Sequence, residues 1–245
     1  MLARLSMSLD TDEWDYRKAS RLQGFMMDRL NPLYANELHE QQMHPYSQTV
    51  LHTAAGSIWQ VCALSAEACE QIIGSLFGKV ETVKLHNERQ EVFVRDMETE
   101  VVEFSELLAE FYQERADKNI TIDFLTPTSF KRNGRYFILP DMRLICQSLM
   151  LRQASLETSF EMLDEDALQD ISESCQITRH RIRSMIFPAE GTKIPGFMGS
   201  VTIRCFGTET MARYLRLLLR FGEFSGVGIK TGMGMGAMRI RREAE

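Results

Sequence analysis

The order of strand-like and helix-like segments constrains the fold of this chain more than any other feature. Alternating apolar residues predict strands, and apolar residues spaced three or four apart predict helices. The first half contains, in order, a strand (2–9), two helices (12–30 and 34–41), two strands (47–54 and 57–64), a helix (65–77), two strands (80–85 and 91–95) and a helix (105–112). The second half contains a strand (120–125), a helix (142–154), two strands (176–187 and 197–206), a helix from 208 through 220 and a strand (237–241).

The order strand–helix–strand–strand–helix–strand is therefore visible in both halves, with additional elements in the first. This order is typical of the ferredoxin-like fold, in which two helices cover one face of an antiparallel sheet, and RNA-recognition modules share it. We predict an α+β protein with two tandem ferredoxin-like domains, residues 1–118 and 119–245. No residue-level repeat links the halves, so the expected duplication lies in element order alone.

Charge separates the halves further. The 245 residues carry a net charge of −6, which argues against a protein that coats nucleic acid over its whole surface. From Asn119 onward, however, the chain has 17 Lys and Arg and 14 Asp and Glu. The preceding residues include 11 Lys and Arg and 20 Asp and Glu. A locally basic surface attracts a polyanion whatever the net charge, although a solvated basic face is the plainer interpretation.

Cysteine usage and hydropathy indicate where such a protein works. The five cysteines are odd in number and form no CxxC pair, which predicts neither a disulfide framework nor a zinc ribbon and favours a reducing cytoplasm. The stretch 43–66 has no charged residues, but it contains histidines and glutamines and does not predict a membrane span. An acidic cluster at 10–15 argues against a signal peptide.

Basic residues cluster at three places in the second half. Arg179, Arg181 and Arg183 alternate along a strand and therefore point to one side, where a polyanion would relieve their mutual repulsion. Lys131 and Arg132 begin a basic turn. The last helix carries arginines at 213, 216 and 220, which share one face. These clusters predict RNA contacts, and an exposed hairpin or helix face is the alternative.

A run of glycines lies between the last helix and the last strand. Glycine permits a positive φ and lets successive amides turn toward one anion. The run lacks the GKS or GKT of a Walker loop, and it follows a helix where a dinucleotide-binding loop would follow a strand. A tight helix-to-strand connection needs only one or two glycines, so packing alone is the weaker interpretation. The glycines are Gly226, Gly228, Gly232, Gly234 and Gly236.

Around this run the chain resembles a known family. The strand from Phe197, the LLRFGEF end of the last helix and SGVGIKTGMGMGAM look like the C-terminus of the CRISPR-repeat-processing endoribonucleases of the RAMP superfamily. LTPTSF at 125–130 is similar to the opening of that family's second domain. LQGF at 22–25 resembles its first helix, and ELHE at 37–40 followed by PYS at 45–47 resembles its histidine-bearing element.

The resemblance implies two ferredoxin-like domains and cleavage of CRISPR repeat RNA without a metal ion or cofactor. In this family the 2′-hydroxyl attacks the scissile phosphate, which leaves a 5′-hydroxyl and a 2′,3′-cyclic phosphate. Such chemistry needs a base, an acid and a cation, and histidine suits the first two because its ordinary pKa of about 6.5 lies near neutrality. His39 stands at the family's position and would face the glycine run, with His44 as the runner-up for a partner role.

The chain departs from the family pattern of Tyr and Lys beside the histidine. Lys230 and Arg21 are the candidates for the cation, and Tyr46 or Tyr34 for the hydroxyl. The arginines at 179, 181 and 183, Lys131, Arg132, Arg21 and the five glycines are the expected RNA-binding residues. The resemblance implies CRISPR repeat RNA as the partner, leaves a homodimer and other CRISPR-associated proteins open, and implies no membrane.

Two other functions compete with the nuclease. A non-catalytic RAMP subunit that holds guide RNA in an effector complex would share the fold and the glycines but would not need a histidine at position 39. A ferredoxin-like regulator that binds a small ligand is a more distant alternative, and the arginine clusters speak against it. RNA cleavage in the presence of a chelator separates the three.

Overall fold

The computed structural model describes residues 1–85, 91–113, 117–156, 162–189 and 191–242. In the first half, the sheet has the strand order β2-β3-β1-β5-β4 and all of its pairs are antiparallel. Its strands are β1 (Leu2–Leu9), β2 (Tyr46–Thr53), β3 (Gly56–Ala63), β4 (Thr82–Lys84) and β5 (Glu91–Val102). The helices of this half are α1 (Ala19–Met27), α2 (Pro32–Glu40), α3 (Ala66–Ala68), a π-helical turn (Cys69–Ile73), α4 (Gly74–Leu76) and α5 (Phe104–Gln113).

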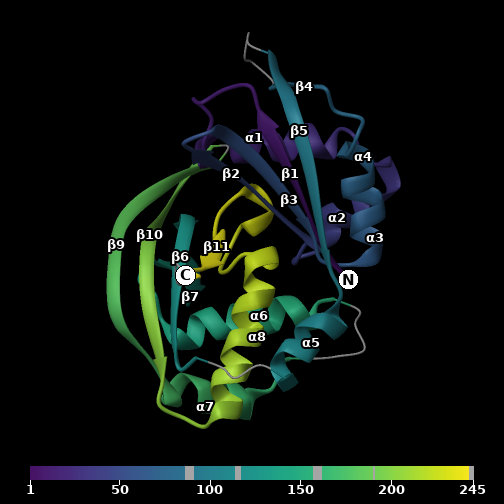
Figure 1. Cartoon of the computed structure of the whole chain (residues 1–245). Coiled ribbons are helices and arrows are strands. Elements are labelled where there is room, and N and C mark those ends of the chain that lie inside the picture. The colour runs from purple at the N-terminus through teal and green to yellow at the C-terminus, as the bar shows by residue number, and fades with distance from the viewer. Residues whose placement is uncertain (86–90, 114–116, 157–161, 190, 243–245) are drawn as a thin grey trace.

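The second half repeats the arrangement with a sheet of order β11-β6-β10-β9. The strands are β6 (Asn119–Thr128), β9 (Cys175–Ala189), β10 (Thr192–Cys205) and β11 (Met238–Ile240), and a separate hairpin joins β7 (Phe130–Arg132) to β8 (Arg135–Phe137). The helices are α6 (Met142–Ala154), α7 (Glu165–Ser174) and α8 (Glu209–Ser225). Figure 1 shows the two sheets one above the other, with α6 and α8 behind and beside the lower one.

The predicted fold class is confirmed. In each half the first strand lies in the centre, flanked by the third and the last strands, as in a ferredoxin-like sheet. In the first half, β4 adds one edge strand beyond that pattern. Helix caps follow the sequence: the side chains of Ser65 and Thr208 accept hydrogen bonds from the amides of Ala68 and Met211.

Element boundaries were predicted less well than element order. The first helix does not begin at residue 12, because the Thr11 hydroxyl accepts the Glu13 amide and holds a turn there. A short 3₁₀ turn (Tyr16–Lys18), capped by Asp15, leads into α1. Helix α7 was not predicted, and β5 and β10 extend seven and five residues further than expected, from 95 to 102 and from 197 back to 192.

The two hydrophobic cores exchange residues across the interface. Phe187 and Ile194, at the far end of the β9–β10 hairpin, lie in the core of the first half together with Met235. Conversely, Leu2 and Val102 belong to the core of the second half. Helix α5 precedes residue 118 but packs against α8, and its Leu107 is buried in the second core. The proposed domain boundary at residue 118 stays a prediction. In the structure, α5 packs with the second half.

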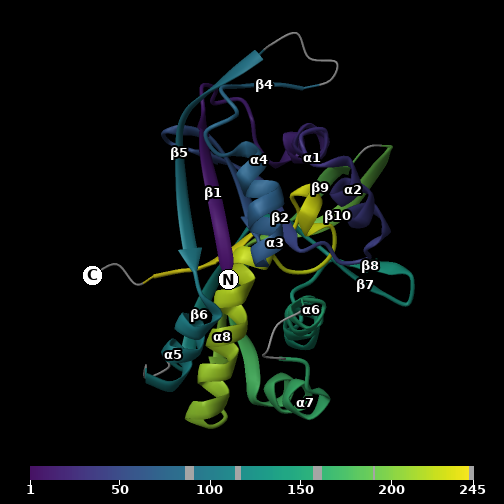
Figure 2. The ribbon, with the colours of Figure 1, turned by 90° about the vertical axis from the view of Figure 1, so that its right-hand side faces the viewer.

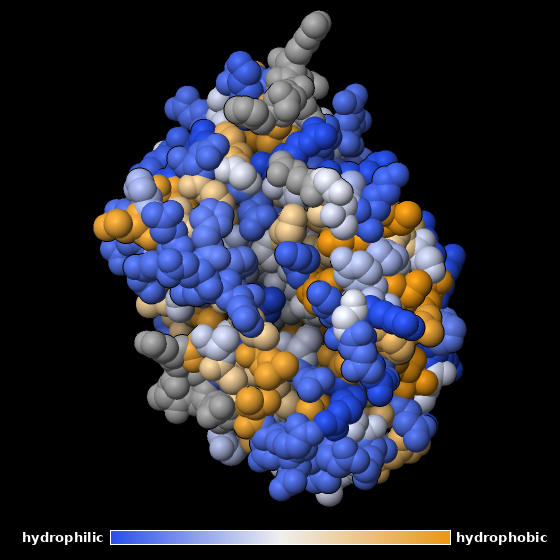
Figure 3. Space-filling view, turned by 180° about the vertical axis from the view of Figure 1, so that it is seen from behind, coloured by the Kyte–Doolittle hydropathy of each residue, from blue (hydrophilic) through white to orange (hydrophobic). Residues whose placement is uncertain are grey.

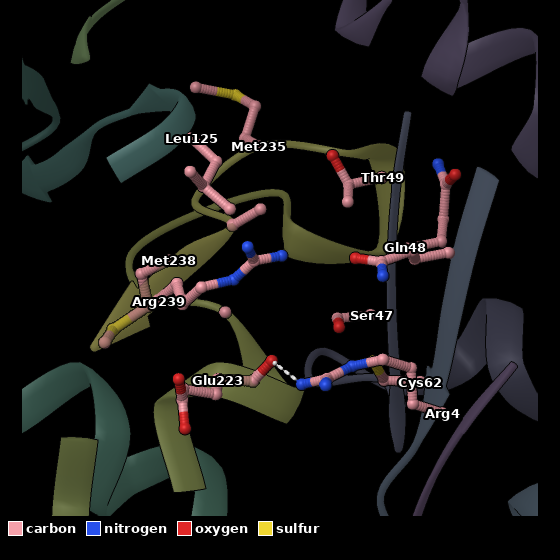
Figure 4. A pocket seen from close by; sticks show the side chains of 13 residues that line it. Arg4, Ser47, Gln48, Thr49, Cys62, Leu125, Glu223, Met235, Met238 and Arg239 are labelled. Atoms are coloured by element: carbon pink, nitrogen blue, oxygen red, sulfur yellow. Dashed lines mark hydrogen bonds between the residues drawn. The ribbon is translucent and has the colours of Figure 1, made fainter. Parts of the chain in front are cut away.

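Polar contacts also cross the interface. The Arg4 guanidinium on β1 donates to the Glu223 carbonyl oxygen of α8 at 2.8 Å and lies over the Phe224 ring, 4.4 Å from its centre. Figure 4 shows this contact beside a small cavity of about 40 Å³, where residues of β1 and β2 face residues of α8 and β11. The Ser47 hydroxyl on β2 donates to the Phe224 carbonyl oxygen at 2.5 Å. The halves are thus joined by apolar and polar contacts alike.

The arginines of α8 have structural partners. Arg220 forms hydrogen-bonded ion pairs with Glu110 of α5, at 3.0 and 3.1 Å, and with Glu223 at 2.5 Å. Arg213 pairs with Glu209 at 2.7 Å. Arg220 therefore joins α8 to α5, and Arg213 is paired within α8, which differs from the RNA contact that their spacing predicted. Within the described residues, no helix is long and apolar enough to span a bilayer.

Candidate active site

A pocket of about 410 Å³ lies where the two halves meet. Figure 2 shows α1, α2, the glycine-rich loop in yellow and α6 on one side of the molecule, and Figure 3 shows that this face is hollowed between two lobes with hydrophilic rims. Both halves contribute side chains to the lining. The first half supplies Ser20, Gln23, Met27, Asp28, His39, Gln42 and His44, and the second supplies Arg152, Lys230 and Thr231, with Gly24, Gly232 and Met233 completing the wall.

Helix α2 places His39 at the pocket. The Asn31 side chain caps the helix through the Leu33 amide, and Pro32 occupies its first position. Tyr34 and Leu38, four residues apart, are buried, so they fix the inner face of the helix. His39 follows in the last turn and is exposed on the pocket side. The expectation that His39 lies near the glycine run agrees with this lining.

His44 lies deeper than His39. Its ring stacks on that of Tyr46 with 5.3 Å between centroids, and its Nδ1 atom is buried without a hydrogen-bond partner in the described structure. Burial lowers the pKa of His44, and the nearby charges of Arg152 and Lys230 lower it further. Since the ordinary value is 6.5, His44 is neutral at pH 7. A neutral imidazole can accept a proton.

Tyr46 lies beneath His44 and is absent from the pocket lining. It is fully buried, and its hydroxyl oxygen accepts a hydrogen bond from the Gln23 side chain at 2.7 Å. Tyr34 is also buried, with its hydroxyl lacking a hydrogen-bond partner among the described residues. Burial raises the pKa of both phenols. Tyr46 thus supports the His44 ring by stacking. A direct role of Tyr46 in the chemistry stays a prediction.

The glycine-rich loop carries Lys230 and Thr231 into the pocket. Lys230 has a positive φ of 57°, is exposed, and precedes a single 3₁₀ turn, Thr231–Met233. Gly232 packs against the two stacked rings: a Cβ there would lie 3.3 Å from His44 Cδ2 and 3.2 Å from Tyr46 Cε2. A side chain at this position would displace the histidine. The loop therefore touches the histidine-bearing segment directly.

Close packing within the protein explains most of the glycines, contrary to the sequence-based interpretation. Gly226, Gly232, Gly234 and Gly236 are buried, and only Gly228 of the five is partly exposed. At Gly236, which has φ of 71°, a Cβ would approach the Val227 carbonyl oxygen to 2.0 Å. The loop amides of Val227, Ile229 and Gly236 bond to protein carbonyl groups. RNA contact by these glycines stays a prediction. Because most of them are buried, exposed neighbours such as Lys230 are better placed to contact RNA.

Arg152 was not predicted as a site residue. It lies near the end of α6, is 9% exposed, and its Nη1 atom donates to the His44 carbonyl oxygen at 3.2 Å. Burial lowers its pKa to about 10. Helical periodicity places Ile145, Leu149 and Arg152 along one buried face, so an arginine there breaks the apolar pattern. This break in the pattern was the one sequence signal for a buried arginine. It was easy to overlook because an arginine within a helix is usually exposed to solvent.

The predicted RNA-binding side chains lie outside the pocket. Arg179, Arg181 and Arg183 are exposed on β9, and the last two line an open groove of about 540 Å³ together with Arg241, which pairs with Asp123. Lys131 and Arg132 are exposed on β7, next to Ser129, whose carbonyl oxygen accepts the Ile229 amide of the glycine-rich loop. Arg21 is exposed on α1 but does not line the pocket.

The described residues gather no group of three or more His, Cys, Asp and Glu side chains suited to a metal ion. Within the pocket, the titratable groups are His39, His44, Asp28, Arg152 and Lys230. The arrangement offers a neutral histidine, an exposed histidine and two cations around one cavity. Such a set can move protons and bind an anion.

Sequence comparison identifies relatives over most of the chain. Residues 122–238 match the family model of the CRISPR-associated endoribonuclease Cas6. A CRISPR-associated endoribonuclease Cas6 from Streptococcus thermophilus is 34% identical over 227 residues, which covers 93% of this chain and 93% of the relative. The protein of the same name from Mycobacterium tuberculosis is 32% identical over 249 residues and covers 98% of this chain and 78% of the relative.

Solved structures show the same fold. A Cas6 product complex superimposes with a TM-score of 0.81 at 22% identity, covering 98% of this chain and 99% of that chain. Cas6 of Thermus thermophilus superimposes with a TM-score of 0.72 at 23% identity, covering 98% of each. With 34% identity to a relative over nearly its whole length, the chain belongs to the Cas6 family of CRISPR-associated endoribonucleases.

Proposed function

We propose that this protein cleaves CRISPR precursor RNA within its repeats and needs no metal ion to do so. Its relatives are named endoribonucleases, and structural neighbours are described as complexes with a product and with a substrate mimic. The observation that carries the proposal is the shared pocket, in which two histidines from one half face two cations from the other. This is the set of groups that metal-free RNA cleavage requires.

The proposed reaction transfers the phosphate within the RNA. The 2′-oxygen attacks the adjacent phosphorus, and the bond from phosphorus to the 5′-oxygen breaks. One proton leaves the 2′-hydroxyl and another joins the departing 5′-oxygen, so the products are a 2′,3′-cyclic phosphate and a 5′-hydroxyl. A base, an acid and positive charge near the phosphate are the contributions that the protein makes.

The histidines divide the proton transfers. His44, held neutral by burial and by neighbouring positive charge, is suited to accept the 2′-hydroxyl proton. His39, exposed on the same pocket, is assigned to donate a proton to the 5′-oxygen. Lys230 supplies positive charge at the opening of the pocket, and Tyr46 holds the His44 ring by stacking. One of the structural neighbours was solved as a histidine-to-alanine mutant.

RNA outside the cleavage site is proposed to lie on basic surfaces of the second half. The arginines at 179, 181 and 183 occupy one strand, and Lys131 and Arg132 extend from the β7–β8 hairpin. Proteins recognise RNA helices mainly through backbone and 2′-hydroxyl contacts, so these side chains contribute affinity that falls with salt. A homodimer and other CRISPR-associated proteins remain further proposed partners.

The test is cleavage of the host's repeat RNA in excess EDTA. Wild-type protein is expected to cut each repeat once and to leave a 5′-hydroxyl. His39→Ala is expected to lower the single-turnover rate constant by about 10³-fold, because a proton-transfer group contributes roughly 10²–10⁴-fold. His52→Ala is the matched control, since His52 is an exposed histidine on β2 that does not line the pocket.

Each outcome has a distinct meaning. Unchanged cleavage by His39→Ala would remove that residue from the reaction and leave His44 to be tested in the same way. Tight binding of the repeat by wild-type protein without any cleavage would favour the non-catalytic guide-RNA subunit. Cleavage that stops when EDTA is added would contradict the metal-free chemistry.

A further inference from the structure

Arg152 is a buried charge that the described part of the protein does not neutralise. Its side chain reaches the pocket from α6, and its only described hydrogen bond is the one to the His44 carbonyl oxygen, at 3.2 Å. A guanidinium group has five N–H donors, so the described residues use only part of its hydrogen-bonding capacity. No Asp or Glu of the described residues forms an ion pair with it, in contrast to Arg220, which binds Glu110 and Glu223.

A charge in this position is costly unless something pairs with it. Removing an ion from water carries a large penalty, which is repaid only by a counter-charge and by hydrogen bonds. The lowered pKa of Arg152 reflects this cost of burying the charge, although the group remains positively charged at pH 7. A phosphate that enters the pocket would supply both the counter-charge and the hydrogen-bond acceptors.

A second polar group in the same pocket lacks a partner. The Thr231 side chain is 1% exposed, and its Oγ1 atom has no hydrogen-bond partner among the described residues. Thr231 follows Lys230 on the glycine-rich loop, so it belongs to the wall that faces the histidine-bearing segment. The hydroxyl is buried, so it donates a hydrogen bond to a ligand oxygen only after the Thr231 side chain turns toward the pocket.

We infer that Arg152 and Thr231, with Lys230 at the opening, form a binding site for a single phosphate group. The guanidinium fork is suited to two oxygen atoms of one phosphate. In the proposed reaction this group is the scissile phosphate, and Arg152 is then a catalytic residue that stabilises negative charge on its non-bridging oxygens. This assignment to the scissile phosphate rests on the proposed function, whereas phosphate binding itself does not.

Arg152 also brings the second half into the proposed phosphate site. The histidines belong to the first half, and the Arg152 guanidinium reaches the same pocket from α6. Its bond to the His44 carbonyl ties the guanidinium to the segment that carries the base. A phosphate bound by Arg152 would therefore lie close to the segment that carries His44.

Phosphate binding is tested without RNA. Inorganic phosphate is expected to raise the Tm of wild-type protein in a concentration-dependent manner, because a ligand that binds only the folded state stabilises it. Sodium chloride at equal ionic strength separates binding from screening. Arg152→Gln is expected to abolish the shift, and Arg143→Gln is expected to keep it. Arg143 is the matched control because it lies on the same helix and pairs with Glu165 outside the pocket.

Catalysis is tested with the repeat RNA. Arg152→Gln is expected to lower the single-turnover rate constant by about 100-fold or more. Arg152→Lys keeps the charge but loses the fork and is expected to recover only part of that loss. Sulfur in place of one non-bridging oxygen of the scissile phosphate is expected to slow wild-type protein for one stereoisomer, and this discrimination is expected to vanish in Arg152→Gln. A purely structural arginine would not change the response to that sulfur.

The outcomes separate this inference from the proposed function. If wild-type protein does not cut the repeat but phosphate still raises the Tm through Arg152, the phosphate site stands and the nuclease proposal fails. If Arg152→Gln cleaves within about threefold of wild type, or if phosphate raises the Tm of both proteins equally, the inference is wrong. If Arg152→Gln unfolds at assay temperature, the stereoisomer discrimination of Arg152→Lys decides, and unchanged discrimination overturns the inference.

Discussion

At the scale of single residues, neighbours that the sequence does not reveal determine function. His44 is neutral because it is buried among cations, and its stacked partner Tyr46 and the adjoining Gly232 leave its ring little room to move. The backbone at Lys230 adopts a left-handed conformation without being glycine, with φ of 57°. Such a conformation is uncommon for residues other than glycine and holds the lysine at the opening of the pocket.

The glycine-rich loop gives a stability prediction at this scale. Gly236→Ala is expected to lower the free energy of unfolding by about 2 kcal/mol or more, because alanine would need a positive φ and its Cβ would overlap the Val227 carbonyl. Gly24→Ala is the matched control. A Cβ at Gly24 of α1 meets nothing within 4 Å, so alanine should stabilise the helix by about 0.5–1 kcal/mol.

Urea denaturation of both variants measures the difference. Equal effects of the two substitutions would contradict the packing explanation of the loop. The same comparison shows what the sequence could reveal: five glycines in one short segment indicate an unusual backbone, but they do not say whether a ligand or another part of the protein comes close. Gly228 lies against the carbonyl group of Ser129, which is distant in sequence. Gly236 lies against the carbonyl group of Val227, which is near in sequence.

At the scale of elements, the sequence predicted most of the architecture. Alternating strands such as β1 and β9 and capped helices such as α8 were located because hydrophobic periodicity is local information. Arg152 was missed because its role depends on contacts across the interface, and the packing of the correctly located α5 against α8 depends on such contacts too. The arginines of α8 illustrate the same limit: helical spacing placed them on one face, and the structure shows Glu110 of α5 against that face.

Strand β9 gives the prediction at this scale. Arg181→Ala is expected to weaken binding of a repeat RNA that carries a 2′-deoxy scissile nucleotide, and to reduce the slope of log K against log salt by about one. Arg95→Ala, an equal change of charge on β5 of the first sheet, should leave both quantities nearly unchanged. Filter binding at several salt concentrations provides the measurement. If the two variants behave alike, β9 makes no specific phosphate contact.

At the scale of the whole molecule, the exchange of core residues joins the halves into one unit. Phe187 and Ile194 are buried among residues of the first half, and Leu2 is buried among those of the second. The pocket requires both halves as well, since His39 lies on α2 of the first half and Arg152 on α6 of the second. Sequence alone divided the chain into two domains and could not show this exchange, because buried apolar residues look alike whichever core receives them.

Cooperative unfolding follows from that exchange. Both tryptophans, Trp14 and Trp59, are buried in the first half, so their fluorescence reports on that half alone. Leu149→Ala, at a fully buried position of α6, removes packing from the second core and is expected to cost about 2–5 kcal/mol. The fluorescence midpoint in urea is expected to shift as much as the circular dichroism midpoint. A fluorescence curve that stays at the wild-type midpoint would show that the halves unfold separately.

The far end of the β9–β10 hairpin has a consequence for the RNA. Because Phe187 and Ile194 anchor that end in the opposite half, the strand that carries the arginines and the cavity that carries the histidines cannot slide past one another. If the arginines hold the transcript while the histidines cut it, the number of nucleotides between grip and cut is a constant of the protein. The enzyme would then act as a gauge, and every processed transcript would begin the same number of nucleotides from the point where it was held.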